Sequence, residues 1–107
     1  MNDIFFGVPL SSCEHFVDVN KMVIATREDE AVAMAVGAWF SGKNPLVFMQ
    51  DSGIGNSLDI ITSLLIPYNI KIDLLISQRT TPEHHKVMGE KSDLILRQVG
   101  YDSFRYC

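Results

Sequence analysis

The sequence predicts an α/β fold: a mostly parallel sheet covered by helices on both faces, in a three-layer α/β/α arrangement. Two observations predict it. Short apolar runs alternate along the chain with segments of helical character, and the runs are continuously apolar rather than alternately apolar and polar. Continuous apolar strands are typical of parallel sheets, whose two faces are both buried. The length of 107 residues predicts a single domain, 1–107.

Strands are expected at residues 4–8, 22–25, 46–49 and 70–76, with a short last strand at 103–106. Helices are expected at 28–40, at 55–65 and from Pro82 to about 99, with a short one from Ser11 or Ser12 to about residue 17. Proline and glycine set several of the boundaries. Pro67 closes the helix at 55–65, and Gly100 stops the last helix.

Parallel sheets of this kind bind ligands at the carboxyl ends of their strands. Four segments directly follow predicted strand ends, namely 9–13, 26–30, 50–56 and 77–85. We expect them to meet at one edge of the sheet. The candidate functional residues of the sequence fall in or next to these segments.

Composition excludes several classes of function. The net charge of −4, from 9 basic and 13 acidic residues, does not favour a nucleic-acid partner. The first residues lack the basic start of a signal peptide, and the longest apolar run, 31–40, is far below the roughly 20 residues of a membrane span. The cysteines and histidines are too sparse to form a metal site. We therefore expect a soluble, cytoplasmic protein that binds no metal by itself and no membrane.

The helix at 28–40 begins with acids and continues with small residues. Thr26 is expected to cap it, with Asp29 as the reciprocal partner, and acids in the first turn suit the positive helix end. The alanines and the glycine at 31, 33, 35, 37 and 38 would let a flat ring or another backbone come close. Tight packing of the helix on its own sheet explains them equally well.

Two further segments carry polar groups. Residues 50–57, QDSGIGNS, place two glycines between a strand and a helix, where backbone amides can face a ligand. The segment lacks the spacing of a phosphate-binding loop, so an ordinary turn capped by Asn56 or Ser57 stays an alternative. His84 and His85 are either solvated surface or groups that titrate at the ligand edge, with Arg79 and Lys86 near enough to hold an anion.

Taken in order, these segments resemble the pyrimidine-binding domain, or alpha subunit, of thiamine-diphosphate-dependent decarboxylases of the phosphonopyruvate and sulfopyruvate type. The resemblance rests on Gly7-Val8-Pro9, on EDEAVAMAVG at 28–37, on KNPLVFMQDSGIGN at 43–56 and on Pro82-Glu83-His84. It covers nearly the whole chain, from Gly7 to about Gly100. It implies a short version of the thiamine-diphosphate-binding fold and a carboxy-lyase that acts on a 2-oxo acid.

The resemblance also implies roles for individual residues. Glu28, nine residues before Gly37, occupies the position of the family glutamate that hydrogen-bonds the aminopyrimidine ring and activates the cofactor. Asp29 and Glu30 do not align with that glutamate. His84 matches a family histidine of the active site, with His85 as the competing choice. The implied sets are, for catalysis, Glu28 and His84; for cofactor binding, Glu28, Gln50, Ser52, Gly53 and Asn56; for substrate binding, Gly7, Val8, Pro9, Asp51, His85 and Arg79.

The chain also departs from the family. It has no Gly-Asp-Gly followed by a downstream asparagine, the element that holds magnesium and diphosphate. A partner chain is therefore expected to supply thiamine diphosphate and Mg²⁺ binding, in a heterodimer or heterotetramer. Asp51 stands where the family usually has an amide or hydroxyl, and a carboxylate there would repel an anionic substrate unless it is paired.

Two other functions remain open from the sequence. The chain could be a non-catalytic remnant or regulatory module that docks on a larger thiamine-diphosphate enzyme. It could also be a free-standing flavodoxin-like domain that binds a small anion at 53–56. Retention of Glu28 favours the catalytic subunit, because a remnant has no need of that carboxylate.

Overall fold

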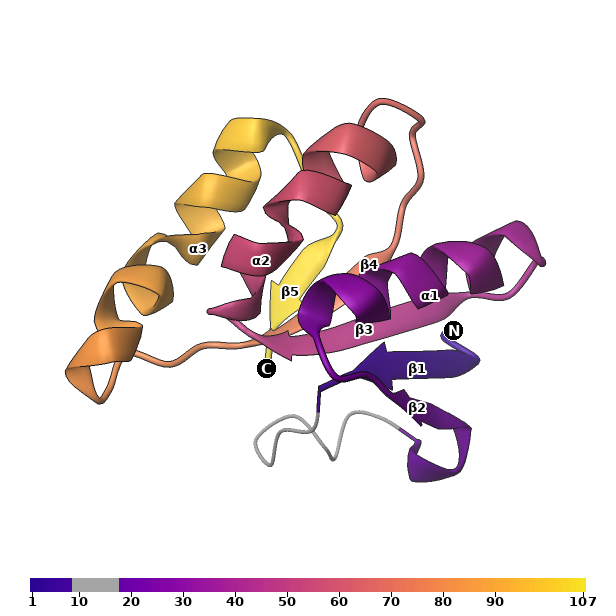
Figure 1. The fold of residues 1–107 in the computed structure, drawn as a ribbon, viewed down its shortest axis with the longest axis horizontal. Coiled ribbons are helices and arrows are strands. Elements are labelled where there is room, and N and C mark those ends of the chain that lie inside the picture. Colours follow the sequence, from indigo (N-terminus) through magenta and orange to yellow (C-terminus); the bar gives the residue numbers. More distant parts are fainter. Residues whose placement is uncertain (9–17) are drawn as a thin grey trace.

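The computed structural model of the chain describes residues 1–8 and 18–107. Five parallel strands form one sheet in the order β2-β1-β3-β4-β5 (Figure 1). Their bounds are β1 Ile4–Gly7, β2 Met22–Ile24, β3 Pro45–Gln50, β4 Asp73–Ser77 and β5 Phe104–Tyr106. Because every pair is parallel, the carboxyl ends of all five strands lie along the same edge of the sheet.

Three main helices connect the strands. Their bounds are α1 Glu28–Phe40, α2 Gly53–Ile60 and α3 Lys86–Val99. The π-helical turn η3, Ile61–Leu65, continues α2, and the 3₁₀ turns η2, Val19–Lys21, and η4, Glu83–His85, precede β2 and α3. All three helices pack on one face of the sheet, because a single buried cluster joins residues of all of them to β1, β3 and β4 (Figure 1).

The central strands are apolar on both faces. In β3, Val47 and Met49 belong to the cluster beneath the helices. Leu46 and Phe48 belong to a second buried cluster, with Phe5 and Leu75. Successive side chains of a strand point to opposite faces, so these two clusters lie on the two sides of the sheet. Continuous burial along β3 is the feature that the sequence pattern predicts.

The predicted α/β class with a parallel sheet is confirmed, and the five parallel strands and three helices are consistent with a three-layer α/β/α fold, of which the described residues supply the sheet and the helical layer on one face. The helix predicted at 28–40 has the observed bounds, and Gly100 ends α3 in the left-handed conformation, with φ +93°. The helix expected between Ser11 or Ser12 and residue 17 lies outside the described residues.

Two local predictions are wrong. The fourth strand begins at Asp73 rather than Ile70. Ile72 does not join the ladder because both of its backbone polar groups bond to the Tyr101 hydroxyl. The residue at the N-cap of α1 is Arg27, without a side-chain cap, rather than Thr26. The amide and hydroxyl of Thr26 instead donate to Glu30, at 2.8 and 3.1 Å.

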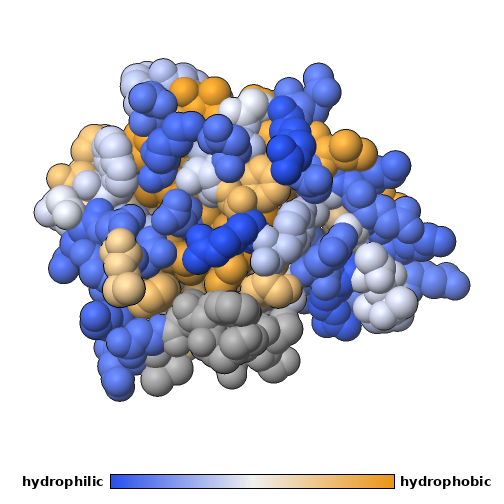
Figure 2. All heavy atoms as spheres, turned by 180° about the vertical axis from the view of Figure 1, so that it is seen from behind, coloured by the Kyte–Doolittle hydropathy of each residue, from blue (hydrophilic) through white to orange (hydrophobic). Residues whose placement is uncertain are grey.

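Seen from behind, the surface carries apolar regions separated by hydrophilic side chains (Figure 2). Larger apolar side chains are exposed in several places over the described part of the chain: on the edge strand β2, at the end of α1, in the turn after η3 and on α3. They include Ile24, Phe40, Tyr68, Val87 and Leu94. Within residues 1–8 and 18–107, no helix is both long enough and apolar enough to cross a bilayer.

Candidate active site

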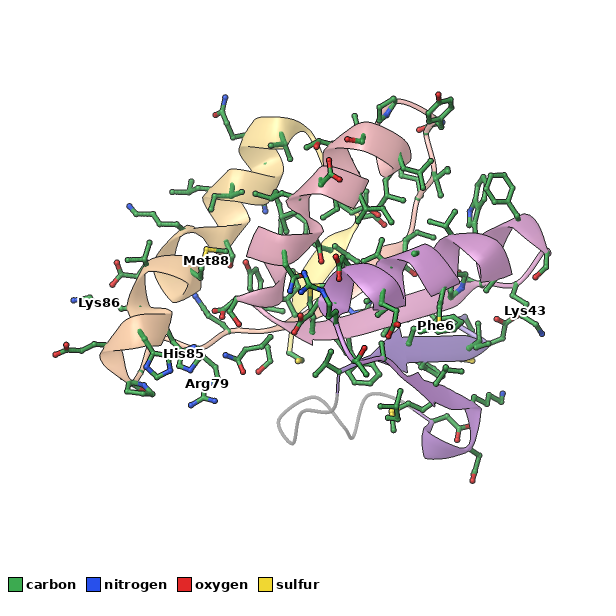
Figure 3. The ribbon with its side chains drawn as sticks, in the orientation of Figure 1. Phe6, Lys43, Arg79, His85, Lys86 and Met88 are labelled. Atoms are coloured by element: carbon green, nitrogen blue, oxygen red, sulfur yellow. The ribbon has the colours of Figure 1, made fainter. Side chains whose placement is uncertain are left out.

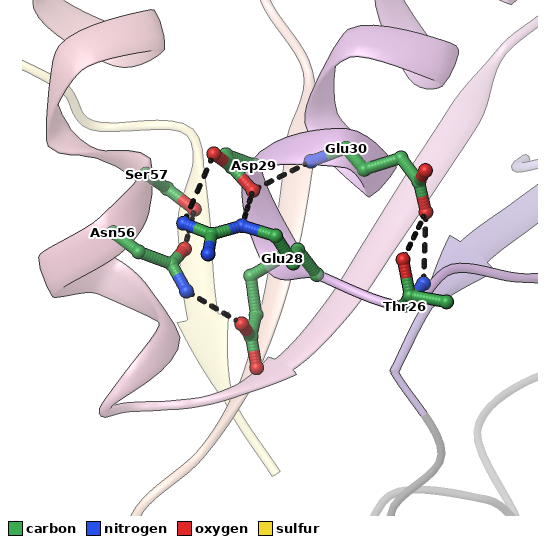
Figure 4. Close-up of polar contacts among 7 residues, drawn as sticks. Thr26, Glu28, Asp29, Glu30, Asn56 and Ser57 are labelled. Carbon is green, nitrogen blue, oxygen red and sulfur yellow. Dashed lines mark hydrogen bonds and ion pairs between the residues drawn. The ribbon is translucent and has the colours of Figure 1, made fainter.

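Glu28 lies at the carboxyl edge of the sheet, where the chain leaves β2 and begins α1. It is the first residue of the helix and is partly buried. Its Oε1 accepts a hydrogen bond of 2.8 Å from Nδ2 of Asn56, in the first turns of α2 (Figure 4). No residue of the described ranges donates to the other oxygen, Oε2. The carboxylate is thus held at one oxygen, while the other has no hydrogen-bond partner within residues 1–8 and 18–107.

Gly53, the first residue of α2, makes room for the Glu28 side chain. A Cβ placed on Gly53 would overlap Cγ of Glu28 and lie 3.0 Å from its Cδ. The overlap is with the stem of the side chain, close to the helix, so it could not be relieved by a small shift of the carboxylate alone. The glycine is therefore required by the approach of Glu28.

The two neighbouring acids have other partners. Asp29 forms an ion pair with Arg27, with Nε and Oδ1 3.0 Å apart, and its hydrogen bond to Arg27 lowers the pKa of the Asp29 carboxyl (Figure 4). Glu30 accepts from Thr26. Among the three acids of the first turn, only Glu28 has a hydrogen bond to a described residue of α2.

A second contact joins β3 to the segment before α3. Nε2 of Gln50 lies 3.0 Å from Nδ1 of His85. An amide nitrogen only donates, so Nδ1 is the acceptor and the neutral ring carries its proton on Nε2. Burial lowers the pKa of His85, and the nearby His84 and Arg79 lower it further, while Asp51 raises it. His84 is exposed and lies against the His85 ring, with centroids 4.1 Å apart.

Asp51 turns inward. Its side chain is fully buried, and its Oδ2 accepts the backbone amide of Arg79 at 2.7 Å. The Asp51 amide in turn donates to Ser77 at 3.0 Å. Asp51 therefore ties the turn after β3 to the loop after β4. The other oxygen, Oδ1, is buried and has no hydrogen-bond partner among the described residues.

Basic groups gather on the loop after β4. Arg79 and Lys86 are exposed and lie at the same end of the molecule as His85 (Figure 3). Lys43, after α1, lies at the other end (Figure 3). Arg79, on the loop, and Lys86, the first residue of α3, thus lie on the His85 side of the carboxyl edge, whereas Arg27 lies beside Glu28 and is paired with Asp29.

The remaining predicted site residues divide into three cases. Gly7 is buried at the end of β1 and is packed against Phe48, and Val8 follows it, half-buried. Ser52 is exposed and precedes α2 without a side-chain cap. Pro9 lies outside the described residues. Of the four segments expected to meet at this edge, the three described ones do so, through Glu28 with Asn56 and through Gln50 with His85.

The structure offers no metal-binding cluster in its described ranges, where no group of three or more histidine, cysteine or acidic side chains is placed to hold an ion. An open cavity of about 380 Å³ lies between the first turns of α1 and α2. Arg27, Asp29, Asn56 and Asp59 are among its lining residues and Glu28 is not. This cavity is next to the Glu28 contact but does not contain its open oxygen.

Comparison with known proteins gives several clear relatives, although no family model matches the chain. The chain is 35% identical over 97 residues to the sulfopyruvate decarboxylase subunit alpha of Methanothermobacter thermautotrophicus, covering 84% of this chain and 59% of that protein. It is 37% identical over 83 residues to the same subunit of Methanocaldococcus jannaschii, covering 72% and 49%. The chain is a homologue of these decarboxylase subunits.

The phosphonopyruvate decarboxylase of Streptomyces viridochromogenes is a further relative, 30% identical over 103 residues, which cover 82% of this chain and 26% of that protein. The resemblance predicted from the sequence motifs is thus confirmed. The chain spans about half the length of the alpha subunits it matches.

Sequence reasoning missed two features of the site. Asn56 was expected to contact a cofactor, and in the structure it bonds to Glu28. Gly89 was not singled out, yet a Cβ there would overlap the carbonyl oxygen of Arg79. A glycine inside a helix costs about 1 kcal/mol relative to alanine, and that cost was the available signal that something packs closely against α3.

Proposed function

We propose that this chain is the pyrimidine-binding subunit of a two-chain, thiamine-diphosphate-dependent 2-oxo acid decarboxylase of the sulfopyruvate and phosphonopyruvate type. One observation carries the proposal: Glu28 stands at the carboxyl edge of a parallel sheet, with Oε1 held by Asn56 at 2.8 Å and Oε2 without a hydrogen-bond partner among the described residues. Homology to decarboxylase alpha subunits supports it. The name of those relatives indicates that they work with a second subunit.

The residues present fit one end of thiamine diphosphate. An open carboxylate oxygen beside a glycine suits a ring nitrogen, which can share a proton with it. The chain has no Gly-Asp-Gly element and, over its described residues, no metal-binding cluster. Within this proposal the diphosphate and Mg²⁺ would be held by the partner chain. When bound, thiamine diphosphate supplies a carbon nucleophile and an electron sink for decarboxylation.

Within this proposal Glu28 moves one proton. Its Oε2 would be the atom that holds the proton shared with a ring nitrogen of the cofactor, while the bond from Asn56 keeps Oε1 engaged. Exclusion of water by the partner chain would strengthen that hydrogen bond, because charges interact more strongly in a less polar medium. Asp29 and Glu30 take no part, because Arg27 and Thr26 engage them.

The substrate end would lie toward the loop after β4. Arg79 and His85 are placed there, and Nε2 of His85 carries a proton that it can donate to an oxygen of the substrate. The exposed guanidinium of Arg79 suits a carboxylate, sulfonate or phosphonate group. Because its side chain is buried, Asp51 would not touch the substrate directly.

The test is reconstitution with a chain that carries Gly-Asp-Gly, using thiamine diphosphate, Mg²⁺ and sulfopyruvate, phosphonopyruvate or pyruvate as substrate. Carbon dioxide release is measured. Glu28→Gln should lower turnover by at least about 100-fold, the usual contribution of a proton-transferring group. Assembly with the partner, followed by size-exclusion chromatography, should be unchanged.

Glu30→Gln is the matched control, because it neutralises an acid of the same helical turn. The Glu30 carboxylate hydrogen-bonds Thr26. This variant should retain turnover within about twofold, since a surface substitution of this kind changes little. Full activity of Glu28→Gln would contradict the catalytic role. A chain that binds no partner and stays monomeric would contradict the subunit itself.

A further inference from the structure

We infer that Asn56 is a positioning residue: with Gly53, it fixes the Glu28 carboxylate so that only Oε2 is presented at the edge. The inference rests on the proposed function, because it concerns the same carboxylate. It assigns Asn56 a role through Glu28 rather than a contact with the cofactor, and it makes the first turns of α2 part of the machinery that α1 carries.

The orientation of the Asn56 amide is set by the Glu28 carboxylate, which can only accept, and is compatible with the neighbouring Ser57 hydroxyl. Its Nδ2 donates to Oε1 of Glu28 at 2.8 Å, and its Oδ1 accepts from the Ser57 hydroxyl at 3.3 Å (Figure 4). Ser57 is fully buried. Rotation of the amide by half a turn would place its oxygen against the carboxylate and lose the bond to Glu28, because both facing oxygens would then be acceptors. The amide therefore offers Glu28 a donor in a defined direction.

Gly53 limits the same side chain at its stem. A Cβ there would overlap Cγ of Glu28. Residues three apart on a helix are neighbours on its surface, so Gly53 and Asn56 lie on one face of α2 and meet Glu28 together. Gly53 leaves the space through which the Glu28 side chain passes, and Asn56 determines which carboxylate oxygen is hydrogen-bonded.

The contact contributes little to holding the helices together. Asn56 is exposed, and an exposed hydrogen bond has a small net effect on folding because water replaces it. The helices already share the large buried cluster. Geometry at a reacting carboxylate matters far more, since a displacement of about 1 Å can reduce a rate about 100-fold. A role in orientation therefore explains this hydrogen bond better than a role in stability.

The experiment uses the reconstituted complex with thiamine diphosphate and Mg²⁺. The measured quantity is the rate at which the thiazolium carbon-bound proton exchanges with deuterium, followed by acid quench and NMR. Asn56→Ala and Asn56→Asp should slow the exchange by about tenfold or more, as expected of a displaced proton-sharing group. Cofactor affinity, measured by calorimetry, should change by less than about threefold, because Asn56 does not touch the cofactor.

Thr62→Ala is the matched control. Thr62 is exposed on η3, bonds only to the carbonyls of its own helical segment, and does not contact Glu28. It should leave both the exchange rate and the affinity as they are. Gly53→Ala, which pushes the Glu28 stem aside, should slow the exchange as Asn56→Ala does.

A double variant separates positioning from an independent effect. If Asn56 acts only through Glu28, Glu28→Gln with Asn56→Ala should exchange no more slowly than Glu28→Gln alone, because groups that act as a unit are not additive. Losses that multiply in the double variant, or an Asn56→Ala variant with normal exchange, would overturn the positioning role. Normal exchange in Glu28→Gln would instead overturn the proposed function.

The isolated chain gives a readout that needs no cofactor. The side-chain amide protons of Asn56 form a distinct pair in an ¹⁵N–¹H spectrum. Glu28→Gln should shift this pair more than Glu30→Gln does, since only Glu28 accepts from it. Equal small shifts in the two variants would show that Asn56 does not hold Glu28 in solution, and would overturn the inference even if Glu28 is essential.

Discussion

Nε2 of Gln50 and Nδ1 of His85 lie 3.0 Å apart and join the end of β3 to the segment before α3. The contact fixes the tautomer of His85, whose Nε2 then carries the proton. It also distinguishes the two adjacent histidines, because His84 is exposed and no described residue hydrogen-bonds its ring. His85 is the histidine that the fold orients at the carboxyl edge.

The first prediction concerns the stability of the chain at acid pH. Burial, with His84 and Arg79, lowers the pKa of His85 below the usual value of about 6.5. As the pH falls, the unfolded chain takes up this proton before the folded chain does, so stability falls as the pH drops through about 6.5. Urea unfolding at pH 7.5 and 5.5 should show a larger loss for the native chain than for His85→Gln. An equal loss in both would contradict the lowered pKa.

Replacing Gln50, the hydrogen-bond partner of His85, by an acid should raise the pKa of His85 and so oppose its lowering. Gln50→Glu places a carboxylate beside Nδ1, which favours the protonated ring and moves a proton onto that nitrogen. In an NMR titration followed at the Hε1 resonance of His85, the pH at the midpoint should be higher in this variant than in the native chain. Gln50→Leu removes the partner without adding charge and serves as the control. A midpoint that does not rise in Gln50→Glu would mean that the two side chains do not meet in solution.

Asp51 should matter for folding. Asp51→Ala removes the acceptor of the Arg79 amide and leaves a buried gap, which should lower the free energy of unfolding by about 1–3 kcal/mol. Asp51→Asn keeps an acceptor and should cost less. Asp59→Ala, at an exposed acid of α2, should change it by at most about 0.5 kcal/mol. Urea denaturation measures all three, and equal values for Asp51→Ala and Asp59→Ala would contradict the buried role.

Much of the fold follows from the sequence because its signals are local. The apolar run of β3 and the acid-rich start of α1 need no knowledge of the rest of the chain. The start of β4 does not follow, because a side chain far along the sequence decides it: the Tyr101 hydroxyl takes the backbone groups of Ile72 out of the ladder. The prediction that Thr26 caps α1, with Asp29 as its partner, was wrong because Thr26 donates to Glu30, one residue further along the helix.

The site shows the same division. The resemblance points to Glu28, and the rule for parallel sheets brings its segment beside 50–56. Neither one predicts which residues touch, because that depends on the path of the Glu28 stem past Gly53. The choice between His84 and His85 likewise depends on where η4 places each ring, and a one-residue difference in the turn would exchange them.

Gly37 and Gly53 provide a matched pair of positions for testing the close approach of the Glu28 side chain to α2. Helix propensity alone predicts that alanine stabilises at either one. Gly37 of α1 has open space around it, so Gly37→Ala should raise the free energy of unfolding by about 0.5–1 kcal/mol. Gly53→Ala should lower it by about 1–3 kcal/mol, because the methyl group would overlap Glu28. Stabilisation by both substitutions would contradict the approach of Glu28 to α2.

Tyr101 is the subject of the last prediction. Its hydroxyl donates to the Ile72 carbonyl and accepts from the Ile72 amide at 2.9 Å, and its side chain is 2% exposed. Tyr101→Phe leaves both backbone groups without this partner. It should lower the free energy of unfolding by about 1–3 kcal/mol at neutral pH, measured by urea denaturation.

The same residue makes the fold sensitive to alkali. Burial raises the pKa of Tyr101 to about 12, against about 10 in the unfolded chain. Between these values the folded chain keeps a proton that the unfolded chain has lost, so stability falls as the pH rises from about 10 to about 12. Tyr101→Phe has no such proton, and its stability should fall less over this range. A parallel decline in the native chain and in Tyr101→Phe would show that the hydroxyl titrates normally and is not held by Ile72.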